Sequence, residues 1–194
     1  MDHTMSAGRR RLGFGERMRQ VLTGLAGIVV SFGLAAFLHF LYDWSGGLRF
    51  TAIFSLVNES VWEHVKILLW PYLLWSIAEY YILKPDLRRL VVARTAGAYT
   101  VAALTICVFY VYTGILGRSV VWFDILSAAL WLLAGEIISL RILNARWTTS
   151  EYYLISLAAL VLLVVMLLCF TVSPPRLGLF ADPVTGLYGL EAMP

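Results

Sequence analysis

Long apolar runs separated by short polar segments make up most of the chain from residue 21 onward. A hydrocarbon core about 30 Å thick needs roughly 20 helical residues to cross it. Five segments meet that requirement, namely 21–42, 61–83, 94–116, 120–143 and 152–172. The pattern predicts an all-α fold, a polytopic membrane protein built as a bundle of five transmembrane helices. We expect one membrane domain over 1–194, with an arm at 1–20 and a tail at 173–194.

The composition supports the membrane class. Hydrophobic residues make up 60% of the chain and charged residues only 14%, and the mean hydropathy is +0.80. Soluble domains carry about 25% charged residues. The net charge of +3 requires no nucleic-acid partner, because basic loops beside anionic lipid account for it. The expected partner is therefore the lipid bilayer.

Basic residues gather in alternate connections between the expected spans. The richer side has Arg9, Arg10, Arg11, Arg17, Arg19, Lys84, Arg88, Arg89, Arg94, Arg141 and Arg146, and the poorer side has Arg49, Arg118 and Arg176. By the positive-inside rule, this bias predicts a cytoplasmic N-terminus and an outside C-terminus. The first apolar run is longer than the core of a signal peptide, so we expect it to remain as a span.

This orientation brings most of the polar groups near the membrane to one outward-facing end. His39 and Asp43 lie one turn apart near the end of the first span, and the stretch NESVWEHVK at 58–66 opens the second. Ionisable groups in a bilayer normally face the bundle interior or a wet cavity, so we predict a polar pocket. Its expected members are His39, Asp43, Asn58, Glu59, Glu63, His64, Lys66 and Asp124, with Asp182 of the tail nearby.

One interpretation of these residues is purely structural. Ser60 and Glu63 have the spacing of a capping box, whose two side chains bind backbone N–H groups at a helix start. Lys66 lies within one turn of Glu63 and can neutralise it. The second span would then simply begin beside lipid headgroups. This interpretation leaves His39, Asp43, Glu59 and His64 without a role.

Metal binding accounts for more of the set. Catalytic zinc sites use three protein ligands and leave one position open. We expect His39, His64 and Glu63 to be ligands of a divalent, zinc-like ion, and Asp43 to orient His39. Glu59 is then the expected general base, which makes Glu59 and Glu63 the candidate catalytic residues. The remaining pocket residues would be Asn58, Lys66, Asp124 and Asp182.

A third interpretation places an ion path through the membrane. Glu136 lies near the middle of the fourth span and Glu79 in the inner half of the second. Unpaired carboxylates inside a membrane are candidates for function. Glu63, Glu136 and Glu79 would mark the outer, middle and inner steps of a proton or cation path. In the alternative reading, Glu79 and Glu136 pair with Arg94 or Arg141, or they are protonated and hydrogen-bonded to Ser139 or a tyrosine.

The tail, SPPRLGLFADPVTGLYGLEAMP, combines turn-forming proline and glycine with large apolar residues. We expect it to fold back as a cap, with DPVTG as a turn and Asp182 near the pocket.

NESVWEH and PPRLGLFADPVTGLYG together resemble the motifs of an uncharacterised family of small bacterial multi-pass membrane proteins, defined only as a domain of unknown function. The resemblance covers nearly the whole chain. It implies a single-domain fold in a bacterial cytoplasmic membrane, and it implies no activity.

The favoured interpretation is a metal-dependent, hydrolase-like enzyme that acts within the membrane on a lipid or small amphiphile. Two alternatives remain open. One is a proton- or cation-coupled small carrier or a ligand-binding membrane subunit. The other is an assembly factor whose polar cluster is structural.

Overall fold

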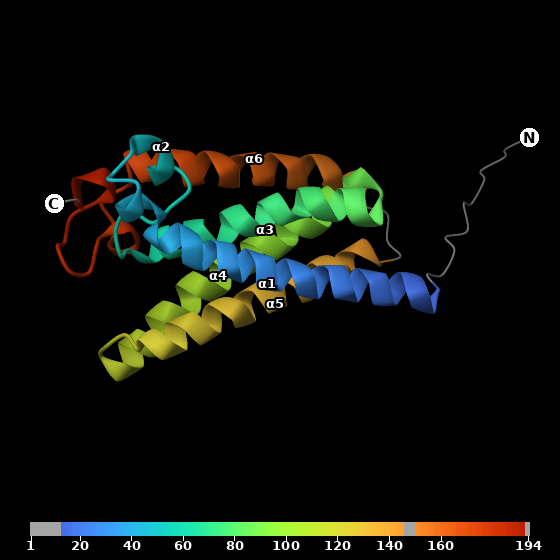
Figure 1. Cartoon of the computed structure of the whole chain (residues 1–194), viewed down its shortest axis with the longest axis horizontal. Coiled ribbons are helices and arrows are strands. Elements are labelled where there is room, and N and C mark those ends of the chain that lie inside the picture. The colour runs from blue at the N-terminus through green and yellow to red at the C-terminus, as the bar shows by residue number, and fades with distance from the viewer. Residues whose placement is uncertain (1–12, 146–149, 193–194) are drawn as a thin grey trace, which may run out of the picture.

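The computed structural model describes residues 13–145 and 150–192 and shows a bundle of long helices (Figure 1). Most of the expected arm, with Arg9, Arg10 and Arg11, lies outside the described residues, as does Arg146. The long helices are α1 (Phe14–Trp44), α3 (Val61–Leu83), α4 (Leu87–Leu116), α5 (Val121–Leu143) and α6 (Ser150–Val172). The short ones are α2 (Arg49–Ala52), η1 (Gly178–Phe180) and η2 (Gly189–Ala192).

The two ends of the bundle differ in what they carry. The start of α1 and the α3–α4 turn lie at one end, which we call the base end (Figure 1). The opposite end holds α2, the start of α3, the α4–α5 connection and the tail, and we call it the mouth end. There the α4–α5 pair diverges from α1 and α3 (Figure 1).

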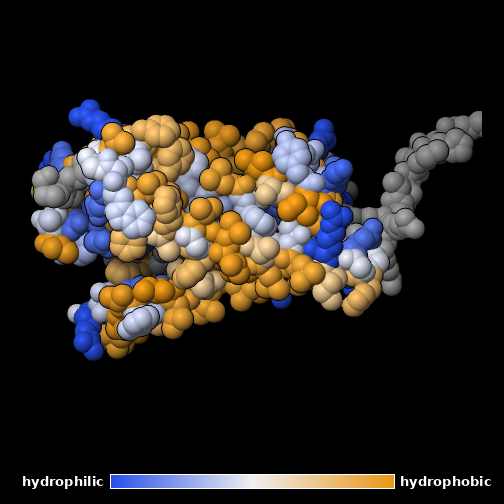
Figure 2. Space-filling model, viewed as in Figure 1, coloured by the Kyte–Doolittle hydropathy of each residue, from blue (hydrophilic) through white to orange (hydrophobic). Residues whose placement is uncertain are grey.

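Four of the helices are long and apolar enough to cross a membrane, namely α1, α4, α5 and α6. Figure 2 shows an apolar band along the bundle with hydrophilic residues gathered at its ends. These helices indicate a membrane protein. The expected count of five spans is not confirmed, because α3 carries Glu63, Lys66 and Glu79 together with tryptophan, tyrosine and proline, which lower its hydropathy.

Helix α3 nevertheless forms much of the core. Its first turn is capped by Ser60, whose hydroxyl accepts a hydrogen bond from the backbone N–H of Glu63. Buried side chains of α3 then pack against α1, α4, α5 and α6. The centre of this core is formed by Val65, Leu68, Leu69, Tyr72, Val101, Leu132, Leu163 and Leu167. The charged side chains Glu63, Lys66 and Glu79 of α3 are buried inside this bundle.

Close packing of α4 on α5 depends on two glycines. A Cβ on Gly135 would lie 2.6 Å from a methyl of Val101 and 2.9 Å from the carbonyl oxygen of Gly97. A Cβ on Gly97 would overlap the hydroxyl of Tyr72. Small residues at such crossings let helix backbones approach closely.

The tail folds back over the mouth end, as the sequence predicts. Phe180 is buried with its ring centroid 5.4 Å from Trp62 of α3 and 5.1 Å from Phe170 of α6. The segment DPVTG forms the expected turn, in which the N–H of Gly186 donates to the carbonyl oxygen of Asp182 at 2.8 Å. The apolar residues of the tail therefore anchor it to the bundle.

Candidate functional site

Two histidines and a carboxylate meet at the mouth end. The Nε2 atom of His39, near the end of α1, lies 4.0 Å from one carboxylate oxygen of Glu59. The Nε2 atom of His64, in the first turn of α3, lies 3.6 Å from the other oxygen. The three groups can each offer a ligand atom, all within 4.8 Å of one another. We call these residues the mouth cluster.

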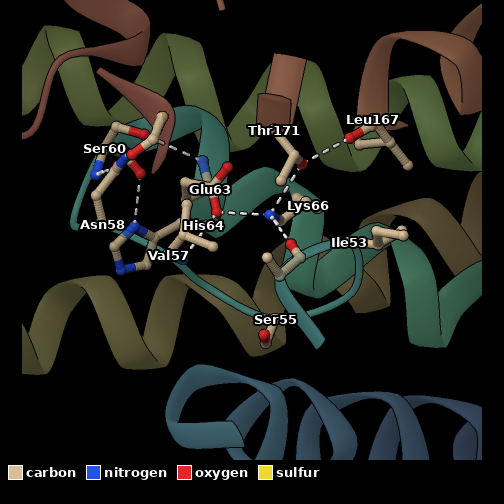
Figure 3. Close-up of polar contacts among 12 residues, drawn as sticks. Ile53, Ser55, Val57, Asn58, Ser60, Glu63, His64, Lys66, Leu167 and Thr171 are labelled. Atoms are coloured by element: carbon tan, nitrogen blue, oxygen red, sulfur yellow. Dashed lines mark hydrogen bonds and ion pairs between the residues drawn. The ribbon is translucent and has the colours of Figure 1, made fainter. Parts of the chain in front are cut away.

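The ring of His64 is held in a defined tautomer. Its Nδ1 atom lies 2.9 Å from the backbone carbonyl oxygen of Ser60, one turn earlier (Figure 3). A carbonyl oxygen can only accept, so Nδ1 carries the hydrogen. Neutral His64 therefore keeps a lone pair on Nε2, which faces Glu59. This is the arrangement by which metal-ligating histidines are usually oriented.

Glu59 is positioned by its own backbone. Its N–H donates to a carboxylate oxygen of Asp182 in the tail at 3.1 Å. The side chain of Asn58 holds the tail as well, since its amide nitrogen donates to the carbonyl oxygen of Gly189 at 3.1 Å. Asn58 and Asp182 thus lie in the predicted region, where they support the mouth cluster from behind.

The carboxyl group of Asp182 is a strong acceptor. Burial favours a raised pKa, but the N–H groups of Thr185, Glu59 and Val184 donate to the carboxylate and outweigh burial. The pKa of Asp182 is therefore held below its usual value. The tail stays docked through an ionised aspartate.

The mouth cluster borders a cavity of about 720 Å³. Its walls come from α1, α3, α4 and α5, and the tail forms part of its rim. Figure 2 shows the molecule hollowed at this end. Drug-sized ligands typically occupy cavities of about 300–1,000 Å³, so this cleft can take a molecule of that size. Its apolar lining includes Phe32, Val108, Phe109, Trp131, Pro183 and Val184.

Asp124 lies on a different wall of the cleft from the histidines. It lies in the first turn of α5 and accepts a hydrogen bond of 2.5 Å from the hydroxyl of Tyr112 on α4. The same hydroxyl accepts from the backbone N–H of Val120 at 3.2 Å. The sequence gives no signal for this contact, since spacing alone does not show which aromatic side chain faces a carboxylate.

Glu63 does not join the histidines. Its carboxylate lies 2.6 Å from Nζ of Lys66, and both side chains are buried (Figure 3). The same carboxylate accepts from the N–H of Val57 at 3.0 Å. Lys66 also donates to the carbonyl oxygen of Ala52 at 2.8 Å and to the hydroxyl of Thr171 at 3.1 Å. Glu63 and Lys66 therefore lie outside the expected metal pocket. They form a buried ion pair with no net charge, which we call the Glu63–Lys66 pair.

Asp43 is likewise not the partner of His39. Its side chain is exposed one turn beyond the histidine, and Glu59 is the ion-pair partner that the described residues give His39. The capping box is also only half formed, since Ser60 caps the helix and Glu63 turns to Val57. Glu59 takes the position expected for Glu63, because the chain before α3 bends toward the end of α1.

A second ionic cluster lies in the base half of the bundle. The guanidinium of Arg94 on α4 forms ion pairs with Glu79 of α3 and, at 2.6 Å, with Glu136 of α5. Arg94 is 2%, Glu79 0% and Glu136 4% exposed. We call these residues the Arg94 triad. Glu79 and Glu136 therefore both pair with Arg94, as expected in the alternative to an ion path.

Helices, cleft and clusters together define an all-helical, membrane-type bundle with a histidine and carboxylate cluster beside an apolar cleft. Residues 18–190 match the family model described as a family of unknown function, DUF6512. The chain belongs to this family, as the resemblance of its motifs to an uncharacterised family predicted. Comparison with curated proteins and with solved structures gave no match.

Proposed function

We propose that the protein binds a divalent, zinc-like metal ion through His39, Glu59 and His64 and hydrolyses a lipid or small amphiphile held in the cleft. The observation that carries this proposal is the convergence of three ligand atoms within 4.8 Å beside an apolar cavity. Two histidines and a carboxylate form a known catalytic zinc ligand set that leaves one position open.

The chain supports the metal site in two ways. The carbonyl oxygen of Ser60 orients the lone pair of His64 toward Glu59, and the tail fixes the backbone of Glu59 through Asp182. A bound zinc-like ion supplies a Lewis acid that polarises a carbonyl or phosphoryl oxygen. The side chains of the mouth cluster are about a third to a half exposed, which leaves room for a substrate atom beside them.

The cleft fits an amphiphile better than a polar solute. Its walls are mostly apolar side chains from four helices, whereas His39 and His64 on one wall and Asp124 on another supply polar groups. An apolar chain in the cleft would place its polar end near the mouth cluster. A hydrolysable ester or phosphoester at that end is the chemistry that we assign to the substrate.

For the membrane arrangement, we propose five spans, with α3 as the fifth, a cytoplasmic base end and an outward-facing mouth end in a bacterial cytoplasmic membrane. Helix α3 has 23 residues, enough for a hydrocarbon core of about 30 Å. Its charges are tolerated because Glu63 and Glu79 each have a basic partner within the bundle. The asymmetry of arginine and lysine between alternate connections supports the orientation.

We favour the enzyme over a carrier because of how the carboxylates are paired. The proposed ion path required Glu63, Glu79 and Glu136 to be free to pass a cation. Each of them instead binds a buried cationic side chain, Lys66 or Arg94. A purely structural role fits the buried Glu63–Lys66 pair. Such a role does not explain the mouth cluster.

The experiment is a hydrolysis assay on the full chain in lipid nanodiscs with added zinc. A long-chain acyl ester of p-nitrophenol and the matching phosphodiester serve as probes. We expect turnover of one probe that chelation abolishes and zinc restores, with His64→Ala inactive. Absence of turnover by metal-loaded protein would overturn the hydrolase assignment, as would equal turnover after chelation.

A matched pair of variants tests the cleft. Ala128→Phe fills the cleft and should reduce turnover at least tenfold, the equivalent of about 1.4 kcal/mol. Ala158→Phe, on the exposed surface of α6, places the same ring outside the cleft and should leave turnover unchanged. Equal turnover in the two variants would show that the substrate does not occupy the cleft.

A further inference from the structure

The Arg94 triad contains two acidic groups and only one basic group. A guanidinium is always charged in proteins, and the triad places two carboxylates against it. With both carboxylates ionised, the cluster would hold a net charge of −1. All three residues are at most 4% exposed, and burying an uncompensated charge is costly.

The neighbours of the triad do not correct the imbalance. Helix α3 presents the ring of Tyr72, whose centroid lies 5.0 Å from the guanidinium carbon of Arg94. Helix α1 presents Gly24, where even a Cβ would lie 2.6 Å from a carboxylate oxygen of Glu136. Neither group brings a positive charge. Within residues 13–145 and 150–192, Arg94 is the cation that pairs with Glu79 or Glu136.

The hydrogen bonds show where the imbalance lies. Both carboxylate oxygens of Glu136 accept from Arg94, at 2.6 and 3.4 Å. Glu79 accepts through Oε2 alone, at 2.5 Å from Nε of Arg94. Its Oε1 is buried and has no hydrogen-bond partner among the described residues. A bare carboxylate oxygen in that position is the least stable feature of the cluster.

We propose that the Arg94 triad is a binding site for one exchangeable proton, seated on Oε1 of Glu79. Binding forms the O–H bond of a carboxylic acid, release returns the proton to water, and no other bond changes. The occupied triad is electrically neutral. It lies about 22 Å from His64 along α3, the length of 15 helical residues, so this site is separate from the mouth cluster and does not rest on the proposed enzyme function.

The proton has a structural consequence. The triad joins α3, α4 and α5, and these helices also wall the cleft. Loss of the proton would leave one uncompensated negative charge between α3 and α5. The charge of the cluster that joins these helices in the base half of the bundle thus depends on this proton.

Infrared spectroscopy of the purified full chain in nanodiscs at neutral pH tests the proposal. The wild-type protein should show the carbonyl stretch of a protonated carboxyl group, shifted in deuterated water. Glu79→Gln should abolish it, because the remaining carboxylate then balances Arg94. By the same charge count, Glu136→Gln should abolish it too. Glu151→Gln, an exposed control on α6, should retain it.

Each other outcome counts against the site. A wild-type spectrum without this band overturns the proposal with no variant required. A band that survives in Glu79→Gln places the proton elsewhere, and one that survives in Glu136→Gln alone refutes the charge count. Both single variants keep a neutral cluster, so failure of either one to fold would also contradict it.

Discussion

The mouth cluster and the Arg94 triad are both built from carboxylates and basic side chains, yet their surroundings differ. Glu59 is 48% exposed and lies 3.6 Å and 4.0 Å from its histidine partners. The triad is almost fully buried, and both carboxylates contact one guanidinium at short range. Loose, accessible groups can accept a ligand, whereas tightly paired ones hold helices together.

Helix α3 contributes to both regions and shows why the difference arises. Near its start it lies beside the cleft, where the α4–α5 pair diverges from α1 and α3 (Figure 1). His64 lines this cleft and is partly exposed. Near its end, α3 packs between its neighbours, and Glu79 has no access to solvent. The same residue types therefore serve different purposes according to how closely the helices pack.

The largest effect should come from removing the cation of the triad. Arg94→Met leaves two buried carboxyl groups without a partner, which we expect to cost about 3–5 kcal/mol of unfolding free energy. Because each carboxyl can neutralise itself by binding a proton, the loss should shrink as the pH falls. Denaturation of wild type and variant in mixed micelles across pH measures this. An equal loss at every pH would contradict the assignment.

The Glu63–Lys66 pair should behave as a second buried unit. Lys66→Met leaves the carboxylate of Glu63 buried and should also cost several kcal/mol, roughly 3 by analogy with other buried pairs. The double variant Glu63→Gln with Lys66→Met removes both charges and should recover much of the loss. A double-mutant cycle of unfolding free energies measures the coupling. Additive losses would show that the two side chains do not depend on each other.

An added methyl group on α4 should destabilise the protein more in the base half than near the mouth end. Gly97→Ala forces the new methyl against the hydroxyl of Tyr72 and should cost about 1–3 kcal/mol. Gly114→Ala, farther along α4, meets no atom within 4 Å and should be neutral or slightly stabilising. Thermal unfolding of the two variants compares them. Equal melting temperatures would contradict the packing described for α4.

Docking of the tail should depend on pH through Asp182. Its pKa is lowered in the folded protein, so its contribution is complete above the ordinary value of about 3.9 and is lost as the pH falls through the lowered value. Asp182→Asn should weaken docking by about 1–2 kcal/mol at neutral pH. Hydrogen exchange at Glu59 and Thr185 reports the docking. Glu191→Gln, an exposed tail control, should exchange as wild type.

Much of the fold is predictable because apolar runs of span length are unambiguous. The range expected for the second span coincides with α3 (Val61–Leu83). Helices α1 and α4 begin earlier than their apolar runs, since good helix formers such as leucine, arginine and glutamate continue the helix beyond the lipid core. The count of spans was less secure, because α3 mixes apolar residues with charges that only tertiary pairing makes acceptable.

The sequence predicts which end of the bundle holds the candidate site, but not which of its side chains contact one another. Helix orientation alone brings His39, Glu59 and His64 to one end of the bundle. Which carboxylate meets the histidines depends on the bend of the chain before α3 and on Lys66, which attracts Glu63. The cleft could not be predicted from the sequence, because it arises where the α4–α5 pair diverges from α1 and α3 rather than from any one motif.

Metal content of the purified protein tests the central claim most directly. After equilibration with zinc and removal of free ion, the wild-type chain should retain about one ion, and His39→Ala and His64→Ala should each retain almost none. Both imidazoles are about a third exposed, so their substitution should change stability by less than about 1 kcal/mol, and loss of the ion would not reflect unfolding. Asp43→Asn, beside the site, should bind as wild type. A wild-type protein without bound zinc, or histidine variants that keep it, would contradict the account.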